Sequence, residues 1–441
     1  MIALAACAVT RNSSTMQRLD AKTLHTSARW WKGNLHTHSF WSDGDDFPEN
    51  IVGWYKHRGY NFLAISDHNI LSVGEKWVDI GSYPRGQTAL AEYKRAFGPR
   101  WVVERDGVSP LSGDNATGRG RREVRLRTLA EFRGKFEEPN RFLLMQSEEI
   151  SDRFESLPIH LIATNLRELV KPQGGGSVRE VMQRNIDAVW EQRRRTGEPM
   201  VPHIAHPNFG WAVTAEDMAP LKGERFFEVY NGHPAIRQYG DKAHASTERV
   251  WDIILTKRLA ELGEEVMYGV AVDDSHNYHA WDIPKSNSGR GWVMVRATAL
   301  TPATLIAAME AGDFYATTGV TLKDVRFDGQ QLSIQIASER GVSYRTQFIG
   351  TRHGYSREHE PVMDAKGKPL RVTQRYSDDI GSVLAEVEGI APSYQFAGDE
   401  IYVRAKMIST KPQRNPYKKG DVEVAWTQPA RLAARVESFK R

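Results

Sequence analysis

Residues 33–38 read Gly-Asn-Leu-His-Thr-His, which places two histidines at the end of a short apolar run. On a β-strand, residues two apart project from the same face, so the imidazoles of His36 and His38 can reach one metal ion. Asp274 and His276 repeat this spacing after the apolar run 267–272. The pattern predicts strands whose ends carry metal ligands.

Between residues 31 and about 315, short apolar runs alternate with longer amphipathic segments, which is typical of βα units around a parallel sheet. The long connection 71–140 contains one helical pattern, 122–136, and we expect it to form a lid or rim. Beyond residue 319, alternating runs predict a smaller β-rich domain. The expected barrel strands are 33–38, 62–66, 142–147, 159–164, 200–205, 226–230 and 267–272, and the clearest helices are 178–196 and 248–262.

The composition of the 441-residue chain, 40% hydrophobic and 26% charged, is ordinary for a globular protein. Its net charge is only +4 and the basic residues do not form long runs, so a nucleic-acid partner is not favoured. The single cysteine, Cys7, excludes a disulfide within the chain. Residues 4–7, Leu-Ala-Ala-Cys, resemble the end of a lipoprotein signal. We therefore expect export to the periplasm, with a lipid anchor on Cys7 as the membrane contact; a cytoplasmic protein is the alternative.

Further residues able to bind metal follow other expected strands. In βα folds the carboxyl ends of parallel strands form the active-site face, and His68, Glu149 and His206 fall at such ends. A single histidine of this kind is most often structural. Several separate strands ending in His, Asp or Glu are not explained in that way, so the sequence predicts a metal centre.

The motifs, taken in order, resemble the PHP superfamily, named for polymerase and histidinol phosphatase, and among its branches the one of carbaryl hydrolase. The resemblance covers residues 31 to about 320. It implies a distorted (β/α)7 barrel. Together with the patterns above, we expect an N-terminal tether 1–30, an α/β metallohydrolase domain 31–320 with a lid-like insert 71–140, and a β-rich, sandwich-like domain 321–441. The motifs are His36-Thr37-His38 with Ser42-Asp43-Gly44, Ser66-Asp67-His68-Asn69, Glu149-Ile150-Ser151, His160, Ala205-His206-Pro207 and Asp274-Ser275-His276.

The same resemblance implies two or three divalent ions, Zn, Mn or Fe, and a set of ligands for each. Asp43 stands where many relatives have a histidine, which leaves the second ion the least defined. The match also selects Glu149 over Glu148, and His206 over His203. The implied ligands are His36, His38 and Asp274 for the first ion, His68, His276 and Asp43 for the second, and His160 and His206 for the third, toward which Glu149 bridges.

The expected charge of this centre indicates the substrate class. Three carboxylates and six neutral imidazoles around three divalent ions leave about +3, which attracts a small anionic substrate. We expect hydrolysis of a phosphate mono- or diester by a metal-bridging hydroxide, with Glu149 and Asp274 acting through the ions. Asn231 and His233 are candidates for substrate contact, and His233 for protonating the leaving group; a loop-stabilising role is the alternative.

Two other functions remain open at this level. The same metal site suits hydrolysis of a carbamate or carboxylic ester, and the aromatic residues of the insert are compatible with an apolar substrate. A noncatalytic, metal-containing surface binding protein is the third possibility. The sequence leaves the oligomeric state open.

Overall fold

The computed structural model describes residues 28–107 and 122–432. Cys7 and nearly all of the expected tether 1–30 lie outside these residues. No helix in the described part of the chain combines the length and the apolar character needed to span a membrane.

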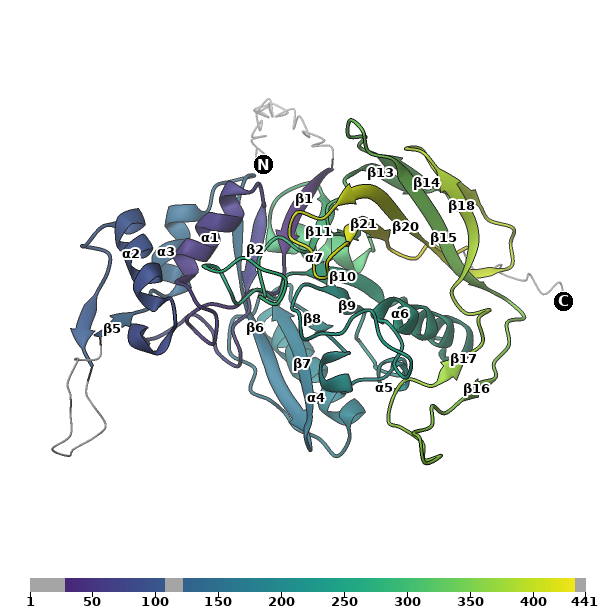
Figure 1. Cartoon of the computed structure of the whole chain (residues 1–441), viewed down its shortest axis with the longest axis horizontal. Coiled ribbons are helices and arrows are strands. Elements are labelled where there is room, and N and C mark those ends of the chain that lie inside the picture. Colours follow the sequence, from purple (N-terminus) through teal and green to yellow (C-terminus); the bar gives the residue numbers. More distant parts are fainter. Residues whose placement is uncertain (1–27, 108–121, 433–441) are drawn as a thin grey trace, which may run out of the picture.

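One large mixed sheet runs through the molecule, and its first seven strands are those that the sequence predicted (Figure 1). They are β1 (Arg29–Asn34), β2 (Phe62–Ile65), β6 (Leu143–Phe154), β7 (Leu157–Thr164), β8 (Val201–Ile204), β9 (Phe226–Asn231) and β10 (Tyr268–Val272). They lie in the order β10-β9-β8-β7-β6-β2-β1. Neighbours are parallel except at β7, which is antiparallel to both β6 and β8.

The two outer strands of this group meet beyond their carboxyl ends. Thr37, just after β1, forms a parallel bridge with Ser275, just after β10. The backbone N–H of His38 donates to the carbonyl of Ser275 at 3.0 Å, and the N–H of Asp274 donates to the carbonyl of His36 at 3.1 Å. The expected strand 33–38 therefore ends four residues early, at Asn34, yet its two histidines are still held in place by these bonds.

Helices cover the outside of the sheet, and local sequence sets their ends. α4 (Val178–Thr196) begins where the Ser177 side chain accepts a hydrogen bond from the N–H of Glu180, and it ends at Gly197, whose φ of 71° suits glycine. The other helices outside the insert between β2 and β6 are α1 (Pro48–His57), α5 (Ala215–Met218), α6 (Thr247–Thr256) with its π-helical continuation η3 (Lys257–Leu262), α7 (Pro302–Glu310) and the short turn η2 (Phe209–Trp211).

The insert between β2 and β6 carries more regular structure than expected. It contains β3 (Trp77–Asp79), η1 (Ile80–Ser82), α2 (Gly86–Phe97), β4 (Glu104–Asp106), β5 (Arg122–Arg125) and α3 (Leu129–Phe136). The expected helix 122–136 is wrong over its first residues, because β5 pairs with β3 and β4 in a small sheet. The helix begins only after Thr128, which forms a capping box with Glu131.

The last third of the chain is β-rich, as predicted, and it continues the same large sheet. β11 (Trp292–Ala297), β12 (Phe314–Thr317), β21 (Val422–Thr427), β20 (Glu400–Pro412), β15 (Tyr344–Arg352) and β18 (Ser382–Glu388) follow β1 in that order. A second sheet of β13 (Leu322–Phe327), β14 (Gln331–Ile336) and β19 (Ser393–Gln395) shares an apolar core with it, which includes Ile334 and Phe348. A small pair, β16 (His359–Glu360) and β17 (Arg375–Tyr376), completes the described strands.

Candidate metal centre

The structure brings together all nine side chains that the sequence proposed as metal ligands. They come from the loops after β1, β2, β8 and β10 and from β6 and β7, and they form four overlapping groups in which the possible ligand atoms lie within 4.8 Å of one another. The groups are His36, His38 and Glu149; His36, His206 and Asp274; His68, Glu149 and His160; and His38, Asp43, His68 and His276.

The innermost ligand atoms have the spacing of a metal polyhedron. The Nε2 atoms of His36 and His38 are 3.0 Å apart, and each lies 3.2 Å from Glu149 Oε2. Asp274 Oδ1 lies 3.3 Å and 3.2 Å from the same two nitrogens. Zinc–nitrogen bonds of about 2.0–2.1 Å place tetrahedral ligands roughly 3.3 Å apart, so these four atoms match the edges of such a site.

Glu149 faces two sets of histidines with its two carboxylate oxygens. Oε2 lies 3.2 Å from His36 and His38 and 2.9 Å from His68 Nδ1. Oε1 lies 2.8 Å from His160 Nδ1 and 2.9 Å from His206 Nε2. This is the arrangement of a carboxylate able to bridge two ions, and it supports the bridging role expected for Glu149.

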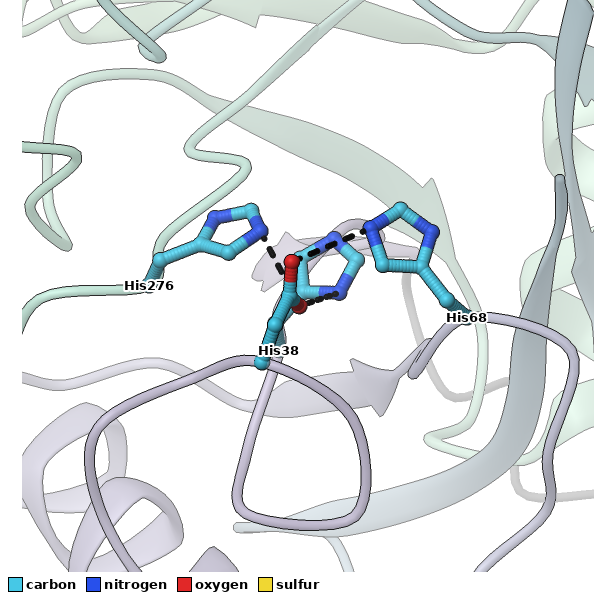
Figure 2. A group of neighbouring side chains, drawn as sticks. His38, His68 and His276 are labelled. Carbon is cyan, nitrogen blue, oxygen red and sulfur yellow. Dashed lines mark ion pairs between the residues drawn. The ribbon is translucent and has the colours of Figure 1, made fainter. Parts of the chain in front are cut away.

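Asp43 belongs to a looser and more exposed group, whose three histidines, His38, His68 and His276, are labelled in Figure 2. Its carboxylate lies 3.4 Å from His276 Nε2, 3.5 Å from His68 Nε2 and 3.6 Å from His38 Nδ1. The Asp43 side chain is 56% exposed, whereas those of His36 and Glu149 are fully buried. The centre is therefore open to solvent on the Asp43 side.

Hydrogen bonds at the other ring nitrogens orient the ligands. His36 Nδ1 lies 2.7 Å from Glu228 Oε1, which leaves Nε2 free for an ion. His276 Nδ1 lies 3.0 Å from the carbonyl of Asp274 and likewise leaves Nε2 free. A partner of this kind fixes the tautomer of a metal-binding histidine and raises its basicity.

Glu228 was missed by the sequence analysis. It lies on β9, fully buried, and its Oε2 accepts hydrogen bonds from the N–H of His206 at 2.8 Å and from the amide of Asn231 at 2.8 Å. The available signal was a lone charged residue inside the apolar run Phe226-Phe227-Glu228-Val229-Tyr230. Including its charge lowers the expected net charge of a three-ion centre from about +3 to about +2.

Asn231 and His233 both lie beside the centre. The Asn231 amide also donates to Asp274 Oδ2 at 3.0 Å, so this residue holds a ligand in place. His233 Nδ1 accepts the N–H of Ala235 at 3.2 Å, which leaves the Nε2 proton as a donor, and its ring centre is 5.3 Å from that of His276. Burial lowers the pKa of His233 to about 4, so the imidazole is neutral. Substrate contact by either residue remains a prediction.

Two ligands have strained backbones. His206 and Asp274 have φ values of 23° and 49°, in the left-handed region that non-glycine residues rarely adopt. Strain of this kind costs on the order of 1–3 kcal/mol and persists where surrounding structure holds it. Here the N–H of His206 is bound by Glu228 and that of Asp274 by His36.

The carboxylates of the centre have only histidines as ionic partners. Among the described residues, no lysine or arginine forms an ion pair with Asp43, Glu149 or Asp274. Burial alone would raise the pKa of Glu149, but the surrounding histidines hold it well below its usual range. Buried carboxylates at this density require cations, and divalent ions fit the nitrogen and oxygen donors present.

Four other acidic or histidine side chains close to these motifs belong to none of the ligand groups. Glu148 Oε1 accepts the N–H of Val170, and burial raises its pKa to about 8. His203 lies 3.2 Å from Glu228 and belongs to none of the ligand groups. Asp273 accepts the Tyr55 hydroxyl and the N–H groups of residues 289–291. Asp67 holds the loop of Asp43, because Ser39 and Ser42 donate to it.

Comparison with known proteins gives distant structural similarity. No family model matches the chain, and no curated protein sequence matches it. A two-domain protein from Bacteroides vulgatus, described as containing a PHP-like metal-dependent phosphoesterase by prediction, is 14% identical, with a TM-score of 0.39 over 96% of this chain and 100% of that chain. A protein from Bifidobacterium adolescentis, described by inference as a metal-dependent phosphoesterase, is 13% identical, with a TM-score of 0.26 over 55% of this chain and 87% of that chain.

Proposed function

We propose that the chain is a metal-dependent hydrolase of PHP type that cleaves a small phosphate mono- or diester. One observation carries the proposal: Glu149 directs its two oxygens toward separate sets of histidines, within a cluster whose ligand spacing fits divalent ions. The motif order resembles the same superfamily. The meeting of β1 and β10 at Thr37 and Ser275 supports a distorted seven-stranded barrel.

The residues that would hold the ions divide into three sets. His36, His38 and Asp274 form the most buried set, and Glu149 links it to His160 and His206. Asp43, His68 and His276 form the set at the solvent side. Bound ions of Zn, Mn or Fe would lower the pKa of a water and stabilise charge on a phosphoryl oxygen.

The protein's own groups would prepare and complete the reaction. Glu228 and Asn231 fix the positions of His36 and Asp274, so the ligands need not reorganise. His233 has a neutral ring beside that of His276 and an Nε2–H not used by the Ala235 contact, so it can donate a hydrogen bond to a phosphoryl or leaving oxygen and stabilise the charge that develops there. The open side at Asp43 is the expected entrance for substrate.

Activity assays on metal-loaded protein test this proposal. We expect turnover of p-nitrophenyl phosphate or bis-p-nitrophenyl phosphate, and its loss in His36→Ala and Asp274→Asn with the fold retained by circular dichroism. His353→Ala, an exposed histidine outside the cluster, is the matched control. Full activity in both ligand variants would exclude this centre as the catalytic site.

The panel also separates the alternatives. Turnover of naphthyl methylcarbamate without phosphatase activity would assign the same centre to carbamate or carboxylic ester hydrolysis. Confirmed metal binding without turnover of any of the three substrates would favour a noncatalytic binding protein.

A further inference from the structure

A second cavity lies apart from the metal centre, where helix α1 meets the loop between β20 and β21. Its volume is about 750 Å3, within the range of small-molecule sites. Trp54 and Arg58 line it from the end of α1, Trp281 from the loop after β10, and Arg414 from the loop after β20. None of the nine metal-centre side chains lines this cavity.

Three cationic side chains face this cavity without a carboxylate partner among the described residues. The Lys32 amine lies 3.9 Å from the ring centre of Tyr60 and 4.1 Å from that of Trp292, and its burial lowers its pKa to about 8. The Arg58 guanidinium lies 4.0 Å from the Trp54 ring centre. Burial and the neighbouring Arg414 both lower the pKa of Arg58. Several cations around one cavity, with no carboxylate paired to them, favour the binding of an anion between them.

The lining carries more basic than acidic side chains: Lys32, Arg58 and Arg414 stand against Asp282 and Glu423. Glu423 lies 3.2 Å from the amine of Lys411, and among the described residues neither carboxylate forms an ion pair with the three cations. The cavity therefore has an excess of positive charge.

An aromatic surface lies beside these cations. The rings of Trp54 and Trp281 stack with centres 5.5 Å apart and planes 16° apart. Trp281 is 48% exposed, an unusual state for so large an apolar side chain. Its outer face can receive another flat ring, which would gain stacking and apolar burial.

We propose that this cavity binds a small organic anion with a flat ring, its charged group held by Lys32, Arg58 and Arg414 and its ring stacked on Trp281. The site is separate from the metal centre, and the proposal does not depend on the reaction catalysed there.

Titration calorimetry of the full-length, metal-loaded protein with 2-naphthalenesulfonate tests this inference. A sulfonate provides the ring and the charge without an ester bond to hydrolyse. In the double variant Arg58→Gln/Arg414→Gln we expect the Kd to rise at least about tenfold, because charge-assisted hydrogen bonds are lost. Trp281→Ala should also weaken binding, whereas Arg95→Gln, an exposed arginine of α2, should not.

Further measurements locate the probe and check the fold. His36→Ala should bind 2-naphthalenesulfonate as the unaltered chain does, and the double variant should keep its metal content and its circular dichroism spectrum. Absence of binding at millimolar probe overturns the inference. So does binding that His36→Ala abolishes or that Arg58→Gln/Arg414→Gln leaves unchanged, because the probe would then lie at the metal centre or elsewhere.

Discussion

Glu228 Oε1 lies 2.7 Å from Nδ1 of His36, on the opposite side of the ring from Glu149. Through this contact a carboxylate outside the four ligand groups fixes the orientation of the fully buried His36 ring. We expect Glu228→Gln to weaken metal binding by roughly 10- to 100-fold without abolishing it, as is usual when such a partner is removed. Competition with a chromogenic chelator measures the affinity.

Glu224 supplies the control for that variant. It is also buried, but within the part of the chain that the structure describes its carboxylate accepts only the N–H groups of Arg225 and Phe226. Glu224→Gln should leave metal affinity unchanged. If both variants weaken metal binding equally, burial rather than the contact with His36 is responsible.

Glu149 and its neighbour Glu148 form a second matched pair. Glu149→Gln should reduce the number of bound ions and lower kcat at least about a hundredfold, because metal ions supply several kcal/mol of transition-state stabilisation. Glu148→Gln should retain the ions, since that carboxylate bonds to Val170 instead. Elemental analysis and initial rates report both effects, and equal behaviour of the two variants would falsify the bridging role.

The group around Asp43 should lose its ion first. Its carboxylate is half exposed and lies 3.4–3.6 Å from its histidines, whereas Glu149 lies 2.8–3.2 Å from its own. Stepwise chelation with EDTA, followed by elemental analysis, should remove one ion before the others. Asp43→Asn should begin with that ion missing and show only the later steps; a full ion content in this variant would contradict the assignment.

His233 should affect chemistry more than metal binding. Among the described residues, its ring accepts one hydrogen bond, from the N–H of Ala235 to Nδ1, and forms none with a proposed metal ligand. We expect His233→Ala to lower kcat by about 10²- to 10³-fold, the usual effect of removing one hydrogen-bond donor to developing charge, with metal content unchanged. A parallel loss of metal would instead indicate that His233 supports His276.

Glu49, which lies outside the metal centre, should make the stability of the fold depend on pH. It is fully buried on α1 and accepts hydrogen bonds from Tyr93 and Trp101 of the insert, and burial raises its pKa to about 7. Because the folded pKa lies above the unfolded value of 4.5, its stabilising contribution is complete below pH 4.5 and is lost as the pH rises through 7.

Removing that carboxyl should therefore change the pH profile. The free energy of unfolding of Glu49→Gln, relative to the unaltered chain, should rise by about 3 kcal/mol between pH 4.5 and pH 8. Urea denaturation at both pH values measures the difference, with exposed Glu358→Gln as the control. A constant difference at the two pH values would show that Glu49 does not titrate in this range.

The sequence predicted what depends on local pattern. The seven strands and α4 follow from apolar runs and amphipathic spacing. His36, His38, Asp274 and His276 follow from their spacing near strand ends, whereas Asp43 and His160 were proposed only through the resemblance to the PHP superfamily. The strand β5 was not predicted, because its residues become a strand only through pairing with β3 and β4. Glu228 was missed for a similar reason, since its partner His36 is 192 residues away in the chain.

The place of β21 in the large sheet has a consequence for folding. This strand, residues 422–427, lies between β12, which precedes it by about a hundred residues, and β20. During synthesis, one edge of β12 therefore stays unpaired until nearly all of the described residues have been made, because its partner β21 lies close to their end. Such long-range pairing slows folding and leaves an unpaired strand edge exposed to aggregation. The second edge of β12 is therefore a place where incomplete chains can associate until Val422–Thr427 has been synthesised.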